Sequence, residues 1–192
     1  MEQIRSFIAV ELPGELKLEL TRLQDRLRLG SQAPAKWVDA NSVHLTLKFL
    51  GNIDRSMADK ITVALDEAVR GIHPFRLALG GLGVFPNERR VQVVWVGLTG
   101  DVEHLSHLQQ RVESSLATLG FAKETRPFTP HLTLARLRDR ATPDERQRLG
   151  QLVVRTDTTT GHSLEVDSIH LMRSQLTSEG AIYSCISSIA LK

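Results

Sequence analysis

Apolar residues recur along the chain with two spacings, one typical of helices and the other typical of strands. Leu16, Leu20, Leu23 and Leu27 follow one another every three or four residues, which places them on one face of a helix. Runs of this kind predict helices at 13–29, 56–70, 105–119 and 143–153. Alternation and β-branched content predict strands at 4–10, 43–50, 75–79, 91–98, 129–135, 164–172 and 181–191. The mixture predicts an α+β fold.

After the first strand, the predicted order α-β-α-β-β occurs twice at an almost constant offset. The corresponding pairs are His44 and His131 at 87 residues, Phe75 and Leu164 at 89, and Trp95 and Tyr183 at 88. This agreement predicts an internal duplication, with approximate repeats 13–99 and 100–192 within one bilobal domain that spans residues 1–192. Two copies are too few for a solenoid. We therefore expect two similar lobes related by a pseudo-twofold axis, with antiparallel sheets that line a central cleft and helices outside.

The tetrapeptide His-Leu-Thr-Leu occurs once in each repeat, at 44–47 and at 131–134. Side chains alternate between the two faces of a strand, so His44 shares a face with Thr46, and His131 shares a face with Thr133. Packing alone has no use for an imidazole at the same place in both copies of a duplication. If the lobes face each other, two imidazoles and two hydroxyls meet in one cavity.

Two histidines and two hydroxyls suit phosphodiester chemistry that needs no metal or other cofactor. One neutral imidazole takes a proton from the attacking oxygen, and one protonated imidazole gives a proton to the leaving oxygen. The hydroxyls donate hydrogen bonds to the non-bridging oxygens. Metal binding is the competing interpretation, but zinc normally takes at least three protein ligands, and neither cysteine nor carboxylate accompanies these histidines at ligand spacing.

Other residues near the two motifs are weaker candidates. Lys48 follows His44 and Thr46 on the same predicted face, so it is a candidate phosphate ligand. Phe7, Trp37 and Phe128 are candidates for stacking a base, with core packing as the alternative for each.

Composition limits the class of protein more than it identifies it. The chain has 192 residues, 41% of them hydrophobic, and a formal net charge of +2, which is too balanced to predict a nucleic-acid binder by itself. Its one cysteine, Cys185, cannot form an internal disulfide. The apolar runs are far shorter than a membrane span, and the N-terminus does not read as a signal peptide. We expect a cytoplasmic protein that contacts no membrane.

The sequence resembles the 2H phosphoesterase superfamily, whose name refers to two His-x-Ser/Thr motifs. Within it, the chain is similar to the bacterial and archaeal RNA 2',3'-cyclic phosphodiesterases, long called 2'-5' RNA ligases. The resemblance covers nearly the whole chain and is carried by RSFIAVELP, WVDANSVHLTLKFLGN, GVFPN with VVWVGL, RPFTPHLTLAR and LMRSQLTSEGAIY.

The resemblance implies hydrolysis of a terminal 2',3'-cyclic phosphate on RNA to a 2'-phosphomonoester. It also implies that the enzyme joins or cleaves 2'-5' linkages in tRNA halves. His44 and His131 match the catalytic pair, with His44 as the acid and His131 as the base, and Thr46 and Thr133 match the phosphate-binding hydroxyls. Arg136 matches an arginine that often follows the second motif, which makes it a candidate phosphate ligand.

Three questions stay open at the level of sequence. Alternation places Arg136 on the opposite face from His131, unless the strand bulges or ends near Ala135. The substrate could be another cyclic phosphate or a 2'-5' oligonucleotide. The protein could also be an RNA-end binding module without turnover. We expect a monomer, although no pattern in the chain sets the oligomeric state.

Overall fold

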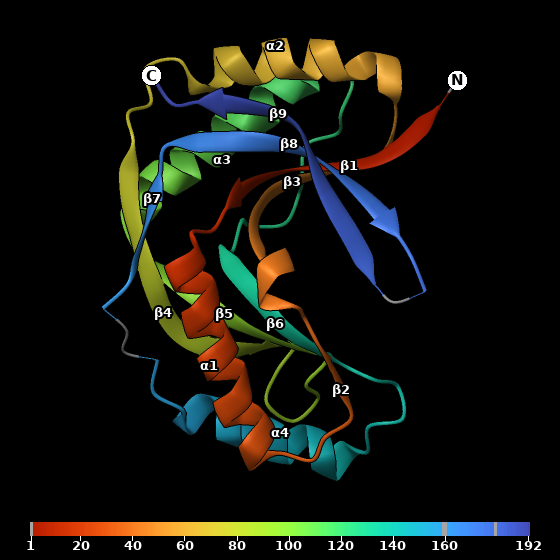
Figure 1. Ribbon diagram of the computed structural model, residues 1–192, viewed down its shortest axis with the longest axis vertical. Helices are drawn as coiled ribbons and strands as arrows, with labels where there is room; N and C mark the ends of the chain where they lie inside the picture. The colour runs from red at the N-terminus through yellow and green to blue at the C-terminus, as the bar shows by residue number, and fades with distance from the viewer. Residues whose placement is uncertain (1, 159–160, 179) are drawn as a thin grey trace.

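The α+β fold is confirmed by a computed structural model, which describes residues 2–158, 161–178 and 180–192. Every strand pair that it describes is antiparallel. The strands form two sheets, which Figure 1 shows one above the other. We call them the His44 sheet and the His131 sheet, after the histidine that each carries.

The His44 sheet has four strands in the spatial order β3-β1-β8-β9. Their bounds are β1 Gln3–Glu11, β3 His44–Asp54, β8 Ser168–Leu176 and β9 Ala181–Ala190. The His131 sheet has five strands in the order β2-β6-β5-β4-β7. Their bounds are β2 Ala35–Trp37, β4 Phe75–Phe85, β5 Val93–Gly100, β6 His131–Leu137 and β7 Ser163–Val166.

Four α-helices cover the outer faces of the two sheets. They are α1 Gly14–Gly30, α2 Ala58–Val69, α3 Val102–Ala117 and α4 Pro143–Arg155. Helices α2 and α3 pack on the His44 sheet, while α1 and α4 lie against the His131 sheet (Figure 1). The other face of each sheet, which we call the inner face, carries the histidine of that sheet. None of the described helices has the length and apolar character needed to span a membrane.

The helices form where the leucine periodicity predicts them. Leu16, Leu20, Leu23 and Leu27 are the apolar residues that α1 buries, and each such side chain contributes about 1.5–3 kcal/mol to folding. Helix α4 begins at a capping box, in which the Thr142 hydroxyl and the Glu145 carboxylate each bind the other residue's backbone N–H. Pro143 occupies the first turn, where its missing N–H costs nothing.

Compared with the predicted strands, one strand is divided in two, one is longer, and the short strand β2 was not predicted. The predicted strand 164–172 is two strands, because the chain leaves the His131 sheet after β7 and enters the His44 sheet at β8. Strand β4 continues through a glycine-rich stretch to Phe85, beyond the predicted end at residue 79. Strand β2 is only three residues long, so it has too few positions to show an alternation.

Each sheet combines strands from both predicted repeats. The His44 sheet joins β3 of the first repeat to β8 and β9 of the second, and the His131 sheet joins β6 of the second repeat to β4 and β5 of the first. The boundary between the repeats therefore does not coincide with the boundary between the sheets. Strands β3 and β6 also approach each other, with Cα atoms within 8 Å. The fold thus brings the two histidine strands together.

Candidate active site

The two histidines are held by the same local hydrogen bond. Nδ1 of His44 lies 3.0 Å from the carbonyl oxygen of Ser42, and Nδ1 of His131 lies 2.6 Å from that of Thr129. A carbonyl can only accept, so Nδ1 must carry the hydrogen in both rings. Nε2 is then the nitrogen left free for proton transfer in each motif. In each motif, the carbonyl two residues before the histidine fixes the same tautomer of the imidazole.

Bulges in the two histidine strands decide which later side chains share the inner face. The pairing of β3 with β1 shifts between Thr46 and Lys48, so Leu47 and Lys48 are both buried, and Phe49 returns to the inner face. The pairing of β6 with β5 shifts in the same way between Thr133 and Ala135. Arg136 therefore lies on the same face as His131 and Thr133. The bulge that this placement requires is present.

Aromatic rings surround His44 on the inner face of its sheet. The ring of Phe7 stacks on the imidazole at a centroid distance of 4.5 Å, and Tyr183 meets it edge-on at 4.9 Å. Burial among these groups lowers the pKa of His44, while the Ser42 carbonyl and the charge of Glu11 act in the opposite direction. The free protein therefore favours neutral His44.

His131 has its own aromatic neighbours, from strands β4 and β5. Phe85 meets the imidazole edge-on at a centroid distance of 5.1 Å, and Trp95 lies at 6.0 Å. A Cβ at Gly83 would clash with the indole of Trp95, so glycine at that position leaves the room that the indole occupies. The indole N–H is buried and has no hydrogen-bond partner among the described residues.

The hydroxyls of Thr46 and Thr133 have no partner in the part of the protein that the structure describes. Neither Thr46 nor Thr133 makes a side-chain hydrogen bond to another described residue, although threonines elsewhere do, such as Thr62 and Thr158. Each threonine lies two residues after its histidine, on the same face of the strand. Both hydroxyls are therefore free to donate to an external acceptor.

The prediction that Lys48 binds phosphate is wrong, because its side chain lies on the core side of the sheet. Lys48 is only 7% exposed, and its Nζ lies 2.6 Å from Oε2 of Glu113 and 2.8 Å from the carbonyl oxygen of Ala122. Gln109 and the backbone N–H of Glu124 also donate to Glu113. The pair ties the bulge of β3 to α3 and to the loop that leads to His131.

Removing one partner of this buried pair should destabilise the fold. Glu113→Gln leaves the Lys48 ammonium without its counter-charge, so we expect the free energy of unfolding to fall by about 3–5 kcal/mol in urea titrations. Glu67→Gln, at the exposed pair between Glu67 and Arg70, is the matched control and should change little. The double variant Lys48→Met with Glu113→Leu should recover most of the loss. Equal costs for the two glutamate variants would contradict this account.

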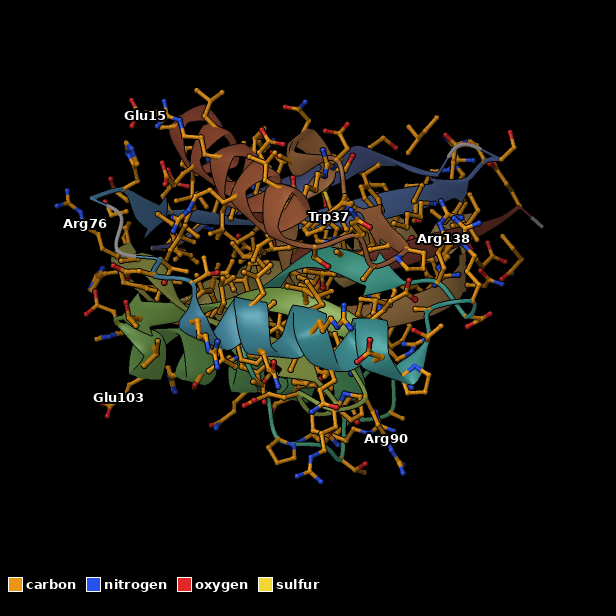
Figure 2. The ribbon with its side chains drawn as sticks, turned by 90° about the horizontal axis from the view of Figure 1, so that it is seen from below. Glu15, Trp37, Arg76, Arg90, Glu103 and Arg138 are labelled. Atoms are coloured by element: carbon orange, nitrogen blue, oxygen red, sulfur yellow. The ribbon has the colours of Figure 1, made fainter. Side chains whose placement is uncertain are left out.

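The three base-stacking candidates do not present a free ring to the site. Phe7 is 2% exposed, because His44, Tyr183 and Phe49 surround it. Trp37 lies on the outer face beside α1, where the guanidinium of Arg28 sits 5.2 Å from the ring centroid (Figure 2). Phe128 is half-buried and packs against the main core. Phe7 is therefore at the site, but its ring packs against the imidazole of His44 and is not free to stack on a base.

Four aromatic residues at the site were not among the candidates taken from the sequence. They are Phe49, Phe85, Trp95 and Tyr183. Trp95 and Tyr183 were matched as a pair in the duplication, and each lies beside the histidine of the other repeat. Phe49 is 69% exposed and faces Phe7, so it offers the most open aromatic ring on the inner face of the His44 sheet. Regular alternation from His44 places Phe49 on the opposite face, and only the bulge in β3 brings its ring to the inner face.

Comparisons with known proteins identify the family of this chain. A family model described as the 2'-5' RNA ligase superfamily matches residues 12–177. An RNA 2',3'-cyclic phosphodiesterase of Methanothermobacter thermautotrophicus is 34% identical over 182 residues, which cover 95% of this chain and 96% of that protein.

Two solved structures share the fold over nearly their whole lengths. The protein TT0787 of Thermus thermophilus matches with a TM-score of 0.78 at 28% identity and covers 98% of both chains. E. coli LigT complexed with 3'-AMP matches with a TM-score of 0.77 at 26% identity, over 100% of this chain and 99% of that one. The two-sheet fold and the family model place the chain in the 2H phosphoesterase class. The chain belongs to the 2'-5' RNA ligase superfamily.

Proposed function

We propose that this protein hydrolyses the 2',3'-cyclic phosphate at the 3' end of an RNA to a 2'-phosphomonoester. The observation that carries the proposal is the matched pair of sites on β3 and β6. Each has an imidazole whose Nδ1 is tied to a backbone carbonyl and a threonine hydroxyl with no partner among the described residues. The relative from Methanothermobacter thermautotrophicus, named for this activity, supports the same reaction.

The proposed step is an in-line displacement at phosphorus. Nε2 of His131 takes a proton from water while the water oxygen forms its bond to phosphorus. The bond from phosphorus to the 3'-oxygen breaks, and Nε2 of His44 gives its proton to that oxygen. Thr46 and Thr133 donate to the non-bridging oxygens, where negative charge builds up in the transition state. A proton returns from His131 to His44 through solvent to complete the cycle.

The two histidine roles follow the family resemblance, and the pKa of His44 in the free protein opposes them. An acid must enter protonated, and burial lowers the pKa of His44. The negative charge of a bound phosphodiester would raise the pKa of both imidazoles. A bound phosphodiester would therefore favour the protonated His44 that this assignment needs, and the effect of an acidic leaving group on the two histidine variants tests it.

The same site would also join RNA ends. If the 5'-hydroxyl of a second RNA takes the place of water, attack on the cyclic phosphate forms a 2'-5' phosphodiester, and the 3'-oxygen leaves as before. We propose that tRNA halves with a cyclic phosphate are one such substrate, and that the enzyme works as a cytoplasmic monomer. Other cyclic phosphates and 2'-5' oligonucleotides are the competing substrates.

Activity should resist removal of metal ions. Among the described residues, no three histidine, cysteine, aspartate or glutamate side chains gather where they could hold an ion. The proposed reaction uses only imidazoles and hydroxyls, so an RNA ending in 2',3'-cyclic phosphate should yield the 2'-phosphomonoester at the same rate with and without EDTA. A rate that disappears in EDTA and returns with a divalent cation would overturn the mechanism. Binding of the RNA end without turnover would favour the binding module.

A further inference from the structure

Two cationic side chains lie directly opposite each other on the inner face of the His131 sheet. Lys36 of β2 pairs with Arg136 of β6. Opposite residues of an antiparallel pair point to the same face, with Cβ atoms about 4.5–5.5 Å apart. The next pair, Trp37 with Ala135, points to the outer face. Lys36 and Arg136 therefore share the inner face with His131 and Thr133, and both are exposed.

This pair has no anionic partner within the described protein. Neither side chain forms an ion pair or a hydrogen bond with a described residue, whereas Lys48, Arg55, Arg70 and Arg173 each have a glutamate. Like charges that face each other across two strands destabilise the sheet. An anion from outside the protein would turn this repulsion into attraction.

The ammonium group of Lys36 also reaches the other sheet. A Cβ placed on Gly180, in the turn between β8 and β9, would lie 3.9 Å from Nζ of Lys36. Three residues further along β9, Tyr183 contacts the ring of His44. The cationic pair thus lies at the end of the inner faces where the hairpin of the His44 sheet meets the edge of the His131 sheet.

We propose that Lys36 and Arg136 bind the phosphodiester on the 5' side of the terminal nucleotide, and that this contact makes the enzyme prefer RNA ends to free cyclic nucleotides. The inference rests on the proposed function. Arg136 follows Thr133 by about 7–10 Å along β6, and Lys36 lies one strand further, about 4.8 Å away. This separation suits the next phosphate of a strand whose cyclic phosphate lies at Thr133. A guanidinium fork beside an ammonium is a common combination for phosphate.

The experiment compares three substrates that share one terminal nucleoside. They are the free nucleoside 2',3'-cyclic phosphate, an oligoribonucleotide that ends in it, and the same oligonucleotide with an uncharged methylphosphonate at the linkage before the last nucleotide. Lys36→Met should raise the KM for the charged oligonucleotide about fivefold to fiftyfold. Its effect on the other two substrates should be several times smaller, because they lack the charged linkage.

The matched control is Lys60→Met, on the exposed surface of α2, which should behave like the wild type. Lys36→Met should also lower the slope of log affinity against log salt by about one for the charged oligonucleotide. An equal rise in KM for all three substrates, or no rise for the charged one, would overturn the proposal.

The phosphate site can be tested even if the protein does not catalyse the proposed reaction. If the wild type turns over none of the substrates, affinity for a fluorescent oligoribonucleotide ending in a 2'-phosphate replaces KM as the measurement. Weaker binding by Lys36→Met, removed by the methylphosphonate, would then support the phosphate site without the reaction. Binding that Lys36→Met does not change would refute the site.

Discussion

His44→Ala should recover most of its lost activity on a substrate whose 3'-leaving group is strongly acidic, whereas His131→Ala should not. On an ordinary RNA end, either change should lower kcat by about a hundredfold to ten-thousandfold, the usual contribution of a general acid or base. An acidic leaving group departs without a proton, so it bypasses the acid alone. The measurement is the single-turnover rate of each variant on both substrates.

The exposed His107 on α3 provides the control, since His107→Ala should leave both rates unchanged. Urea unfolding of each histidine variant separates a lost catalyst from a lost fold. Rescue of His131→Ala instead of His44→Ala would exchange the two roles. Rescue of neither variant would refute the division into acid and base.

The pH dependence follows from the lowered pKa of His44. If His44 is the acid, kcat/KM should fall as the pH rises through this pKa, which lies below the ordinary value of about 6.5, since the free enzyme must be protonated there. If His44 is the base, kcat/KM should rise through the same pKa. The falling limb of kcat should lie at higher pH than that of kcat/KM when the bound phosphate recharges His44. The measured profile is bell-shaped under either assignment, and its two limbs belong to the pair of histidines and not to His44 alone, so the leaving-group experiment is needed to identify the acid.

Thr46→Ala and Thr133→Ala should each lower kcat about tenfold to a thousandfold, the cost of removing one donor to a developing oxyanion. Their hydroxyls have no partner among the described residues, so the stability of the fold should change little. Because the bond to phosphate strengthens in the transition state, kcat should fall more than KM rises.

Thr21→Ala on α1 is the matched control, because the Thr21 hydroxyl donates to the Lys17 carbonyl of its own helix, far from either motif in the sequence. A thionucleotide substrate, in which sulfur replaces one non-bridging oxygen, adds a second measurement. Each threonine variant should lose its sensitivity to one of the two sulfur diastereomers. Wild-type kinetics in both variants would show that these hydroxyls do not contact the phosphate.

Local sequence determined the elements and the two motifs. The leucine spacing of residues 16–27 predicts α1 from the 3.6-residue helical repeat alone. The capping box that begins α4 consists of Thr142 and Glu145, which lie within four consecutive residues. Strand alternation likewise places His44 with Thr46 and His131 with Thr133, because two residues apart is too short a distance for the backbone to change face without a bulge.

Beyond each threonine, regular alternation predicts the wrong face of the strand for Lys48 and for Arg136. Lys48 was expected beside Thr46 and is buried against Glu113, 65 residues away in the chain. Arg136 was expected opposite His131 and shares its face. Both outcomes come from one extra residue in each histidine strand, and that residue is set by the partner strands β1 and β5, which are distant in sequence.

Local sequence also did not show that each sheet combines strands from both predicted repeats. The duplication predicted which segments correspond, and only the packed sheets decided that Trp95 accompanies His131 and Tyr183 accompanies His44. Helices and motifs depend on neighbours within a few positions, so the chain specifies them by itself. The register of a strand and the choice of its partner depend on which apolar faces of remote segments are buried together. The free energy of that burial is gained only when the whole fold is assembled, so local sequence does not specify it.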